Sequence, residues 1–289
     1  MDDTARPYRS VLYIPGSRER ALEKAKSLPA DAIIFDLEDA VATEEKGNAR
    51  ALLARTLAAG GYGRRAQIVR LNGQDSEWGT DDLAAIMEIG PQAVLLPKVE
   101  SPAQVEAVAA ALDAHPACTG TRIWAMMETP RGILNALAIA TAPRMAGFII
   151  GTNDLAKELN CRFRPDRLPL QAALQTCLLA ARAAGIPCID GVYNAFRDDD
   201  GLRAECEQGR DLGMDGKTLI HPAQLAIANE VFAPSAEEVD LARRQIAAFE
   251  EAEAKGLGVA VVDGKIVENL HIVTAMATLA RAQAVGDQG

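Results

Sequence analysis

The sequence lacks any long hydrophobic run: no apolar stretch approaches the roughly 20 residues that a helix needs to cross a bilayer. Residues 1–10, MDDTARPYRS, are polar and lack the apolar segment of a signal peptide. The five cysteines are scattered, without a CxxC pair or a histidine at zinc spacing, which argues against a disulfide framework or a zinc site. We therefore expect a cytoplasmic protein with reduced thiols and no membrane partner.

Basic residues are also scarce relative to acidic ones. There are 30 Lys and Arg against 40 Asp and Glu, which gives a net charge of −10. An acidic protein is a poor match for nucleic acid as its main partner. An anionic small molecule stays compatible with this charge, because it responds to the local field of a pocket. With 289 residues, 49% of them hydrophobic, the chain is long enough for one large domain.

Short apolar runs alternate with segments of helical periodicity up to about residue 234. Each run is continuously apolar, which is typical of strands that are covered on both faces. The eight runs are residues 10–16, 32–39, 66–73, 93–100, 122–130, 145–155, 186–192 and 217–222. Eight such strands with intervening helices predict an α/β protein, a (β/α)8 TIM barrel over residues 1–234. The alternative is an open doubly wound sheet, but no GxGxxG follows the first run.

The alternation stops after residue 234. A helical segment, the hairpin-like stretch VAVVDGKIVEN and a last helix follow. Ser235 with Glu238 predicts a capping box at the first of these helices, as Ser101 with Gln104 does within the barrel. Residues 235–289 are therefore predicted to form a helix–hairpin–helix appendage on the barrel.

Polar residues follow nearly every predicted strand. In a parallel barrel the C-terminal ends of the strands face the mouth of the active site. The residues at these positions are Asp36, Glu38, Asp39, Arg70, Asn72, Lys98, Glu100, Glu128, Asn153, Asp154, Asp190 and His221. A scaffold without a site has no need of so many charged groups at one end, so we expect the active site there.

Glu128 and Asp154 follow neighbouring strands of the predicted barrel. Two carboxylates so placed can bind a hard divalent cation, Mg²⁺ or alternatively Mn²⁺, with water and substrate oxygens completing the coordination. Each residue also has a structural interpretation. Glu128 could be a loop carboxylate beside a helix start, and Asp154 the N-cap of the helix that follows.

Arg70 lies within a strand-like run, so its charge needs an anionic partner near the core. A guanidinium suits a bidentate clamp on a substrate carboxylate. The alternative is a buried structural pair with Asp36 or Glu38. If Arg70 is the clamp, these two carboxylates would orient Arg70, Lys98 or a metal-bound water, and both are candidate catalytic residues.

Eight stretches of the chain look familiar together, in order along its length. They are YIPGSRERALEKA, IIFDLEDAV, VRLNG, LLPKVES, METPRGILNA, GTNDL, IDGVY and DGKTLIHPAQL. This set resembles the citrate lyase β-subunit-like proteins of the HpcH/HpaI aldolase superfamily, which include malyl-CoA and citramalyl-CoA lyases. The resemblance covers essentially the whole chain. It implies a TIM barrel, a Mg²⁺ ion, a CoA thioester as substrate and a small keto acid (glyoxylate, pyruvate or oxaloacetate) as the second partner.

Carried over to matching positions, the resemblance makes Glu128 and Asp154 the metal ligands and Arg70 the clamp on the substrate carboxylate. The stretch PGSRERALEK is similar to a segment that helps to hold CoA phosphates. It makes Arg18 and Lys24 candidate contacts.

Lys98 is a further candidate substrate contact. Similar proteins are commonly trimers or hexamers in which the C-terminal segment closes over a neighbouring subunit's site. We therefore expect a homotrimer, or a hexamer, in which residues 235–289 act as a lid.

The sequence departs from the family pattern in this C-terminal segment. Many related lyases carry an acid–base Asp there, in a pattern like GKMIDxP, whereas this chain has GKIVEN at 264–269. Glu268 takes the place of the Asp, one methylene further out, and a displacement of about 1 Å can cost on the order of 100-fold in rate. Alternatively, Glu268 is a solvated hairpin or helix-cap residue.

These residues lead to ranked hypotheses for the reaction. The first is Mg²⁺-dependent cleavage or formation of the carbon–carbon bond of a carboxylated 3-hydroxyacyl-CoA such as malyl-CoA or citramalyl-CoA, with Glu268 transferring the proton. The second is hydrolysis of the malyl-CoA thioester, with Glu268 activating a water; the Asp-to-Glu departure is its support. Further alternatives are a citrate lyase β subunit that depends on partner subunits and a CoA-independent aldolase. The long appendage argues against the last.

Overall fold

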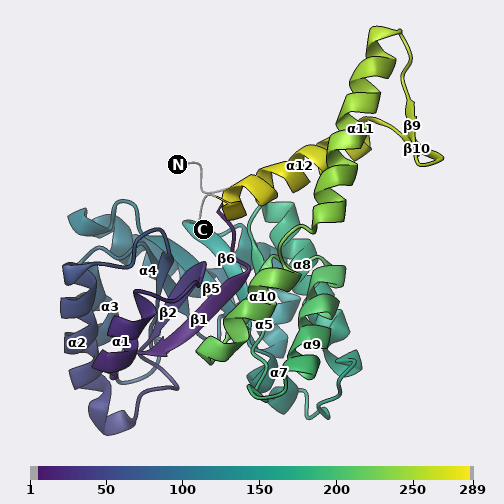
Figure 1. Cartoon of the computed structure of the whole chain (residues 1–289). Coiled ribbons are helices and arrows are strands. Elements are labelled where there is room, and N and C mark those ends of the chain that lie inside the picture. Colours follow the sequence, from purple (N-terminus) through teal and green to yellow (C-terminus); the bar gives the residue numbers. More distant parts are fainter. Residues whose placement is uncertain (1–5, 287–289) are drawn as a thin grey trace. The chain divides into compact units, whose positions relative to one another are not determined.

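Eight parallel strands close into a barrel surrounded by helices (Figure 1). The computed structural model describes residues 6–286. Each strand pairs in parallel with the next, and the first also pairs with the eighth. All eight predicted strands are present, and the predicted (β/α)8 class is confirmed.

The strands of the barrel are β1 (Ser10–Pro15), β2 (Ala32–Asp36), β3 (Ala66–Arg70), β4 (Ala93–Leu96), β5 (Arg122–Met127), β6 (Met145–Ile150), β7 (Cys188–Asp190) and β8 (Gly216–Leu219). The α-helices between and after them are α1 (Glu19–Ala25), α2 (Lys46–Ala59), α3 (Gly79–Met87), α4 (Pro102–Ala114), α5 (Pro130–Leu134), α6 (Ala136–Ala140), α7 (Thr152–Glu158), α8 (Gln171–Ala184), α9 (Asp199–Leu212) and α10 (Leu225–Val231). The predicted capping box at Ser101 and Gln104 starts α4.

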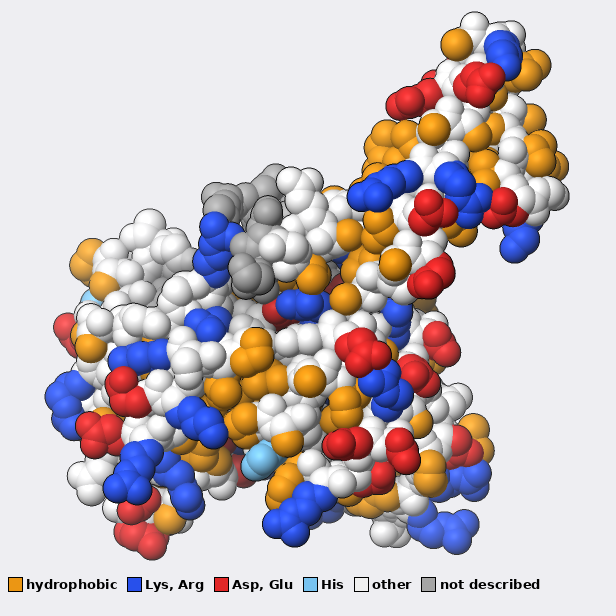
Figure 2. All heavy atoms as spheres, viewed as in Figure 1, with side chains coloured by type: hydrophobic (Ala, Val, Ile, Leu, Met, Phe, Trp, Pro, Cys, Tyr) orange, Lys and Arg blue, Asp and Glu red, His pale blue; other side chains and the backbone are white. Residues whose placement is uncertain are grey.

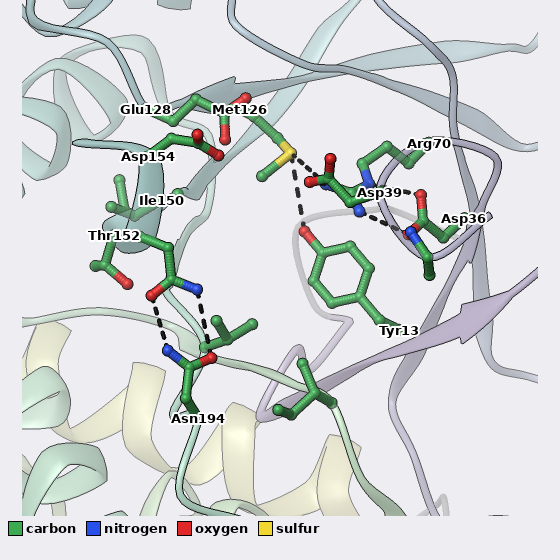
Figure 3. Close-up of a pocket in the computed structure, with 15 residues that line it drawn as sticks. Tyr13, Asp36, Asp39, Arg70, Met126, Glu128, Ile150, Thr152, Asp154 and Asn194 are labelled. Carbon is green, nitrogen blue, oxygen red and sulfur yellow. Dashed lines mark hydrogen bonds and ion pairs between the residues drawn. The ribbon is translucent and has the colours of Figure 1, made fainter. Parts of the chain in front are cut away.

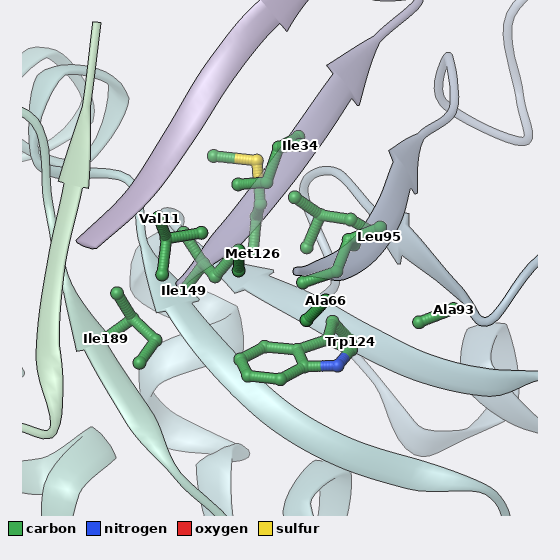
Figure 4. Packing of buried hydrophobic residues seen from close by; sticks show 11 residues of the cluster. Val11, Ile34, Ala66, Ala93, Leu95, Trp124, Met126, Ile149 and Ile189 are labelled. Carbon is green, nitrogen blue, oxygen red and sulfur yellow. The ribbon is translucent and has the colours of Figure 1, made fainter. Parts of the chain in front are cut away.

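The interior of the barrel is filled by alternate residues of its strands (Figure 4). The buried core residues include Val11, Ala32, Ile34, Ala66, Ile68, Leu95, Trp124, Met126, Ile149 and Ile189. Gly147 on β6 lies against the Trp124 ring, and a Cβ at this position would overlap the ring. Glycine is therefore required for the indole to fill the barrel.

The same alternation leads from the core into a polar layer. Side chains of a strand alternate between its two faces, so the position two residues beyond an inward core residue also faces inward. On β2, β3 and immediately after β5, these positions hold Asp36, Arg70 and Glu128. The sequence thus turns from apolar to charged at one end of the barrel on the inner face.

The described chain divides into two compact units, one spanning Tyr8–Asn229 and a second that contains the residues from Glu230 onward. The second unit comprises α11 (Ala236–Ala254), β9 (Ala260–Val262), β10 (Lys265–Val267) and α12 (Asn269–Gly286). The two strands form an antiparallel hairpin, so the predicted helix–hairpin–helix order is confirmed. The predicted capping box at Ser235 and Glu238 starts α11.

The second unit has a small core of its own, formed by Phe249, Ala252, Ala260, Val267 and Ile272. It also exposes hydrophobic side chains (Figure 2), among them Val261, Ile266, Leu270, Val273 and Met276. Within residues 6–286, no helix is both long enough and apolar enough to span a membrane. The lid function predicted for residues 235–289 stays a prediction.

Candidate active site

A pocket of about 290 Å³ opens where the barrel strands end (Figure 3). Its walls combine side chains from β1, β2, β3, β5 and the start of α7. The lining residues include Tyr13, Asp36, Arg70, Met126, Glu128 and Asp154. Positions far apart in the sequence therefore meet in one pocket, at the end of the barrel where active sites of this fold lie.

The guanidinium group of Arg70 is buried among carboxylates. Its Nε and Nη2 atoms donate to the two oxygens of Asp36 at 2.7 and 2.6 Å. Its Nη1 atom lies 2.8 Å from Glu38 Oε2 and 3.3 Å from Asp39 Oδ2. The structural pairing considered for Arg70 is thus present, with both predicted partners. Nη1 is the nitrogen left to meet a substrate carboxylate, in competition with Glu38 and Asp39.

Asp36 explains why β2 ends in a cluster of negative charge. Besides Arg70, its carboxylate accepts the backbone N–H groups of Glu38 at 2.8 Å and of Ala40 at 3.1 Å. These bonds fold the chain after β2 so that the Glu38 side chain returns to Arg70. Burial raises the pKa of Glu38 to about 7, although Arg70 acts to lower it. The cluster is therefore a partly buried charged group at the pocket.

Glu128 lies between β5 and the start of α5, as its structural interpretation has it, but it is 2% exposed and lines the pocket. Its Oε1 atom accepts the backbone N–H of Lys98 at 2.8 Å. Burial raises the pKa of the Glu128 carboxyl to about 7; the Lys98 hydrogen bond opposes this rise, and the charges of Glu38 and Asp154 add to it. A cation beside Glu128 would stabilise its charged form.

Asp154 lies beside Glu128, and their carboxylates are close to one another (Figure 3). Asp154 is in the first turn of α7, whose N-cap is Gly151, and no side chain caps this helix. The N-cap interpretation of Asp154 is therefore wrong. Its side chain instead lines the pocket.

The charges around the pocket are unbalanced. Two cations, Arg70 and Lys98, lie among the carboxylates of Asp36, Glu38, Asp39, Glu128 and Asp154. Mg²⁺ is commonly held by one or two carboxylates, with water and substrate oxygens in the remaining positions. Within residues 6–286, no group of three or more His, Cys, Asp or Glu is arranged to hold a metal by itself. Glu128 and Asp154 fit a Mg²⁺ site of this kind: they would supply the two carboxylates, and the remaining positions would be left to water and a ligand.

Gly151 keeps the space beside Glu128 open, because a Cβ at this position would overlap the Oε2 and Cβ atoms of Glu128. Gly151→Ala is expected to displace the Glu128 carboxylate and lower kcat/KM on the order of 100-fold, the cost of about 1 Å of misplacement. Initial rates measure this effect. Gly120→Ala is the matched control, because a Cβ there meets nothing within 4 Å. Equal rates for the two variants would contradict the role given to Gly151.

The predicted CoA contacts do not line this pocket. Arg18 is the N-cap residue of α1 and Lys24 lies in the last turn of that helix; both are exposed. Ser17, next to Arg18, lines a second pocket together with Arg55. Lys98 has an exposed side chain and a left-handed backbone with φ of 48°. The contacts of Arg18, Lys24 and Lys98 with substrate stay predictions.

Glu268 belongs to the second unit and lies between β10 and α12. It is exposed, and its backbone N–H donates to His271 Nδ1 at 3.0 Å. Its acid–base role stays a prediction.

Several side chains of the pocket, Tyr13 and Met126 among them, are absent from the residues that the sequence singled out. These two are inward positions of their strands, as the period of two indicates: Val11 lies in the core, so Tyr13 faces inward two residues later. An aromatic residue within an apolar strand is typical of a hydrophobic core. The sequence therefore gave no indication that Tyr13 lines the pocket.

Asp190 is a predicted strand-end residue that the structure places outside the pocket. Ile189 is the inward residue of β7. Asp190 instead accepts hydrogen bonds from Arg167 Nη1 at 2.7 and 2.8 Å and from Lys217 Nζ at 3.3 Å. Lys217 Nζ also donates to Glu205 Oε1 at 2.6 Å. We call these four residues the buried ionic cluster.

Comparison with known proteins relates the whole chain to characterised relatives. It is 65% identical over 289 residues to the (3S)-malyl-CoA thioesterase of Cereibacter sphaeroides, covering 100% of this chain and 99% of the relative. It is 37% identical to the citrate lyase subunit beta of Escherichia coli (strain K12), covering 97% of this chain and 95% of that protein.

Solved structures show the same fold. CitE from Mycobacterium tuberculosis, in complex with magnesium, acetoacetate and coenzyme A, has a TM-score of 0.82 at 30% sequence identity, covering 96% of this chain and 99% of that one. RipC from Yersinia pestis has a TM-score of 0.69 at 32% identity, covering 82% and 99%. A family model, HpcH/HpaI aldolase/citrate lyase, matches residues 9–222. The chain therefore belongs to the HpcH/HpaI aldolase/citrate lyase family, as its sequence motifs had indicated.

Proposed function

We propose that this protein is a Mg²⁺-dependent thioesterase that hydrolyses a carboxylated 3-hydroxyacyl-CoA such as malyl-CoA. One observation carries the proposal: the Glu128–Asp154 pair lies beside Arg70 in a chain that is 65% identical, along its whole length, to a (3S)-malyl-CoA thioesterase. Thioester hydrolysis was the second of the hypotheses drawn from the sequence. The identity of this relative is the reason to place it first.

Glu128 and Asp154 are the proposed Mg²⁺ ligands. The CitE structure, solved with magnesium and coenzyme A at 30% identity, supports a Mg²⁺ ion and a CoA-containing ligand for this family member. When bound, Mg²⁺ supplies Lewis-acid polarisation of substrate oxygens. The excess of carboxylates around Arg70 and Lys98 favours the binding of a divalent cation at this position.

The chain's own residues bind the substrate and transfer the proton. Arg70 Nη1 orients the carboxylate end of the substrate. Glu268 of a neighbouring subunit takes a proton from the attacking water. The water oxygen forms a bond to the thioester carbon, the C–S bond breaks, and the departing thiolate receives the proton. The products are free CoA and malate.

The second candidate is the carbon–carbon lyase reaction. It is favoured by the 37% identity to citrate lyase subunit beta, across 97% of this chain. The same carboxylate pair and Arg70 would serve it, with Glu268 transferring the proton to or from the acetyl-CoA fragment. A dependence on partner subunits, as in a multi-subunit citrate lyase, is a weaker candidate because the relative named as such a subunit is 37% identical, against 65% for the thioesterase.

We further propose a cytoplasmic homo-oligomer, a trimer or a hexamer, in which residues 235–289 cover a neighbouring subunit's site. The exposed hydrophobic side chains of the second unit support this, because apolar patches on a soluble surface commonly mark interaction sites. The free cysteines of the described chain are consistent with a reducing compartment.

Product analysis tests the reaction directly. The purified protein is incubated with Mg²⁺ and either malyl-CoA or citramalyl-CoA, and the products are identified by mass spectrometry. We expect free CoA with malate or citramalate, according to the substrate, and no product after the metal is removed with EDTA. Acetyl-CoA with glyoxylate or pyruvate would instead establish the lyase. Turnover that persists unchanged in EDTA would contradict the metal site.

A further inference from the structure

Tyr13 faces the pocket with a hydroxyl group that has only a weak acceptor. Among residues 6–286, its hydrogen-bond partner is the Met126 sulfur, at an O···S distance of 3.9 Å. Tyr13 is partly buried. A tyrosine hydroxyl shielded from water usually finds a good hydrogen-bond partner, and a thioether is a poor acceptor. The polar end of Tyr13 is therefore poorly satisfied where the pocket is open.

Arg70 reaches the same sulfur atom. Its Nη1 lies 3.7 Å from Met126 Sδ, and its guanidinium carbon lies 4.9 Å from the centre of the Tyr13 ring. Figure 3 shows the two donors converging on this sulfur from β1 and β3. An oxygen atom placed beside Met126 Sδ could accept from both donors at once.

The charge around this point restricts what such an oxygen can be. Arg70 is already surrounded by three carboxylates, so an incoming substrate carboxylate is repelled by them. A neutral donor beside Arg70 offsets part of that repulsion, because it adds a hydrogen bond to the anion. Burial raises the pKa of the Tyr13 phenol, so it is a protonated donor at neutral pH.

We propose that Tyr13 is a positioning residue, whose hydroxyl and Arg70 Nη1 together hold one oxygen of the substrate's carboxylate beside Met126. This inference rests on the proposed function in taking a carboxylated acyl-CoA as the ligand. It extends the proposed function by assigning recognition of the substrate's carboxylate to the side chains of Tyr13 and Arg70. The alternative interpretation is that the Tyr13 ring only packs at the end of the barrel interior and that its hydroxyl does not contact the substrate.

The Tyr13→Phe variant separates these interpretations, because it keeps the ring and its contact with Arg70 and removes only the hydroxyl. Tyr62→Phe is the matched control. Tyr62 is more deeply buried than Tyr13, its hydroxyl donates to the Leu22 carbonyl at 3.1 Å, and it does not line the pocket.

The two variants are expected to have opposite effects. Tyr13→Phe should raise the KM for malyl-CoA and the Kd for L-malate by about 10-fold, the value of a hydrogen bond to a charged group, and barely change the melting temperature. Tyr62→Phe should lower the melting temperature and leave KM and Kd unchanged. 3-Hydroxybutyryl-CoA, which has a methyl group in place of the carboxylate, should bind wild type and Tyr13→Phe equally.

Calorimetric titration with L-malate in Mg²⁺ makes the test independent of turnover. If the wild-type protein binds malate but releases acetyl-CoA from malyl-CoA, the thioesterase proposal is refuted. The role of Tyr13 is still supported in that case if Tyr13→Phe binds malate more weakly than wild type. Wild-type malate affinity in Tyr13→Phe, or an equal loss for malate and 3-hydroxybutyryl-CoA, overturns the role of Tyr13. So does a wild-type protein that binds no malate.

A second measurement does not depend on a folded Tyr13 variant. Malate binding to the wild-type protein and to Tyr62→Phe should give the same tyrosine ultraviolet difference spectrum, because the Tyr13 phenol exchanges a sulfur acceptor for a carboxylate oxygen. Absence of this spectrum when malate is bound would contradict the proposal.

Discussion

Glu128→Gln is expected to lower kcat/KM for malyl-CoA by about 100- to 1,000-fold, because Lewis-acid stabilisation by a bound metal is worth several kcal/mol and about 1.4 kcal/mol corresponds to a factor of ten. The substitution keeps the shape of the side chain and its acceptor for the Lys98 N–H, but removes a ligand charge. Steady-state kinetics at saturating Mg²⁺ measure the loss. Glu106→Gln, an exposed change on α4, is the matched control and should have no effect.

The stability of the same variant is expected to change in the opposite direction. Without metal, Glu128→Gln removes one of the clustered negative charges and should raise the melting temperature at pH 8. With Mg²⁺, wild type should gain stability from ligand binding, by about 2.7 kcal/mol at 100 times Kd, and the variant should not. Scanning calorimetry with and without Mg²⁺ gives both values. A variant that is stabilised by Mg²⁺ as strongly as wild type would show that Glu128 is not a ligand.

Lys217→Met is expected to destabilise the barrel by about 3–5 kcal/mol, the cost of removing one partner from a buried ion pair. Lys217 is fully buried, and it donates to Glu205 at 2.6 Å and to the Gly191 carbonyl at 2.6 Å. Without it, Asp190 and Glu205 would share Arg167 as their only cation within the buried ionic cluster. The melting temperature should fall on the order of 10 °C.

A control and a double variant identify the cause of this loss. Lys255→Met removes an exposed ion pair with Glu251 and should cost less than about 1 kcal/mol. Lys217→Met combined with Glu205→Gln should be more stable than Lys217→Met alone, because the excess negative charge is reduced. If the double variant loses stability additively, lost packing and not charge imbalance is the cause.

The fold could be predicted from the sequence because its strands are apolar on both faces and appear as continuous runs between helices. The polar residues that follow them, such as Asp36, Arg70 and Glu128, line the pocket at the end of the barrel where the sequence predicted a site. The family motifs gave the same fold, and the matching family model confirms their assignment.

Other features depend on three-dimensional information that the runs do not contain. A strand with apolar residues on both faces does not reveal which face its last residue occupies. Asp190 therefore looked like a member of the site, although Ile189 takes the inward position. The Glu38 and Ala40 N–H groups donate to Asp36, and these bonds depend on the path of the chain after β2. The number of carboxylates around Arg70 therefore could not be predicted from the sequence.

The residues of the pocket do not distinguish carbon–carbon cleavage from thioester hydrolysis. In the proposed mechanisms both reactions would use the same carboxylate pair and the same clamp, and they would differ in where Glu268 transfers its proton. Because Glu268 follows β10 in the second unit, the sequence of the barrel does not indicate which of the two reactions takes place. The relative at 65% identity is named a thioesterase and the relative at 37% identity a citrate lyase subunit. Product analysis is therefore the measurement that distinguishes the two reactions.

The backbone N–H of Lys98 makes the state of Glu128 observable from outside the pocket. Lys98 is otherwise an exposed loop residue, and its N–H has Glu128 Oε1 as its acceptor. The hydrogen-exchange rate of this single amide therefore depends on how firmly the carboxylate is held. In an isotope-labelling experiment, one surface position thus reports how well ordered the buried carboxylate is, without a substrate and without a reaction.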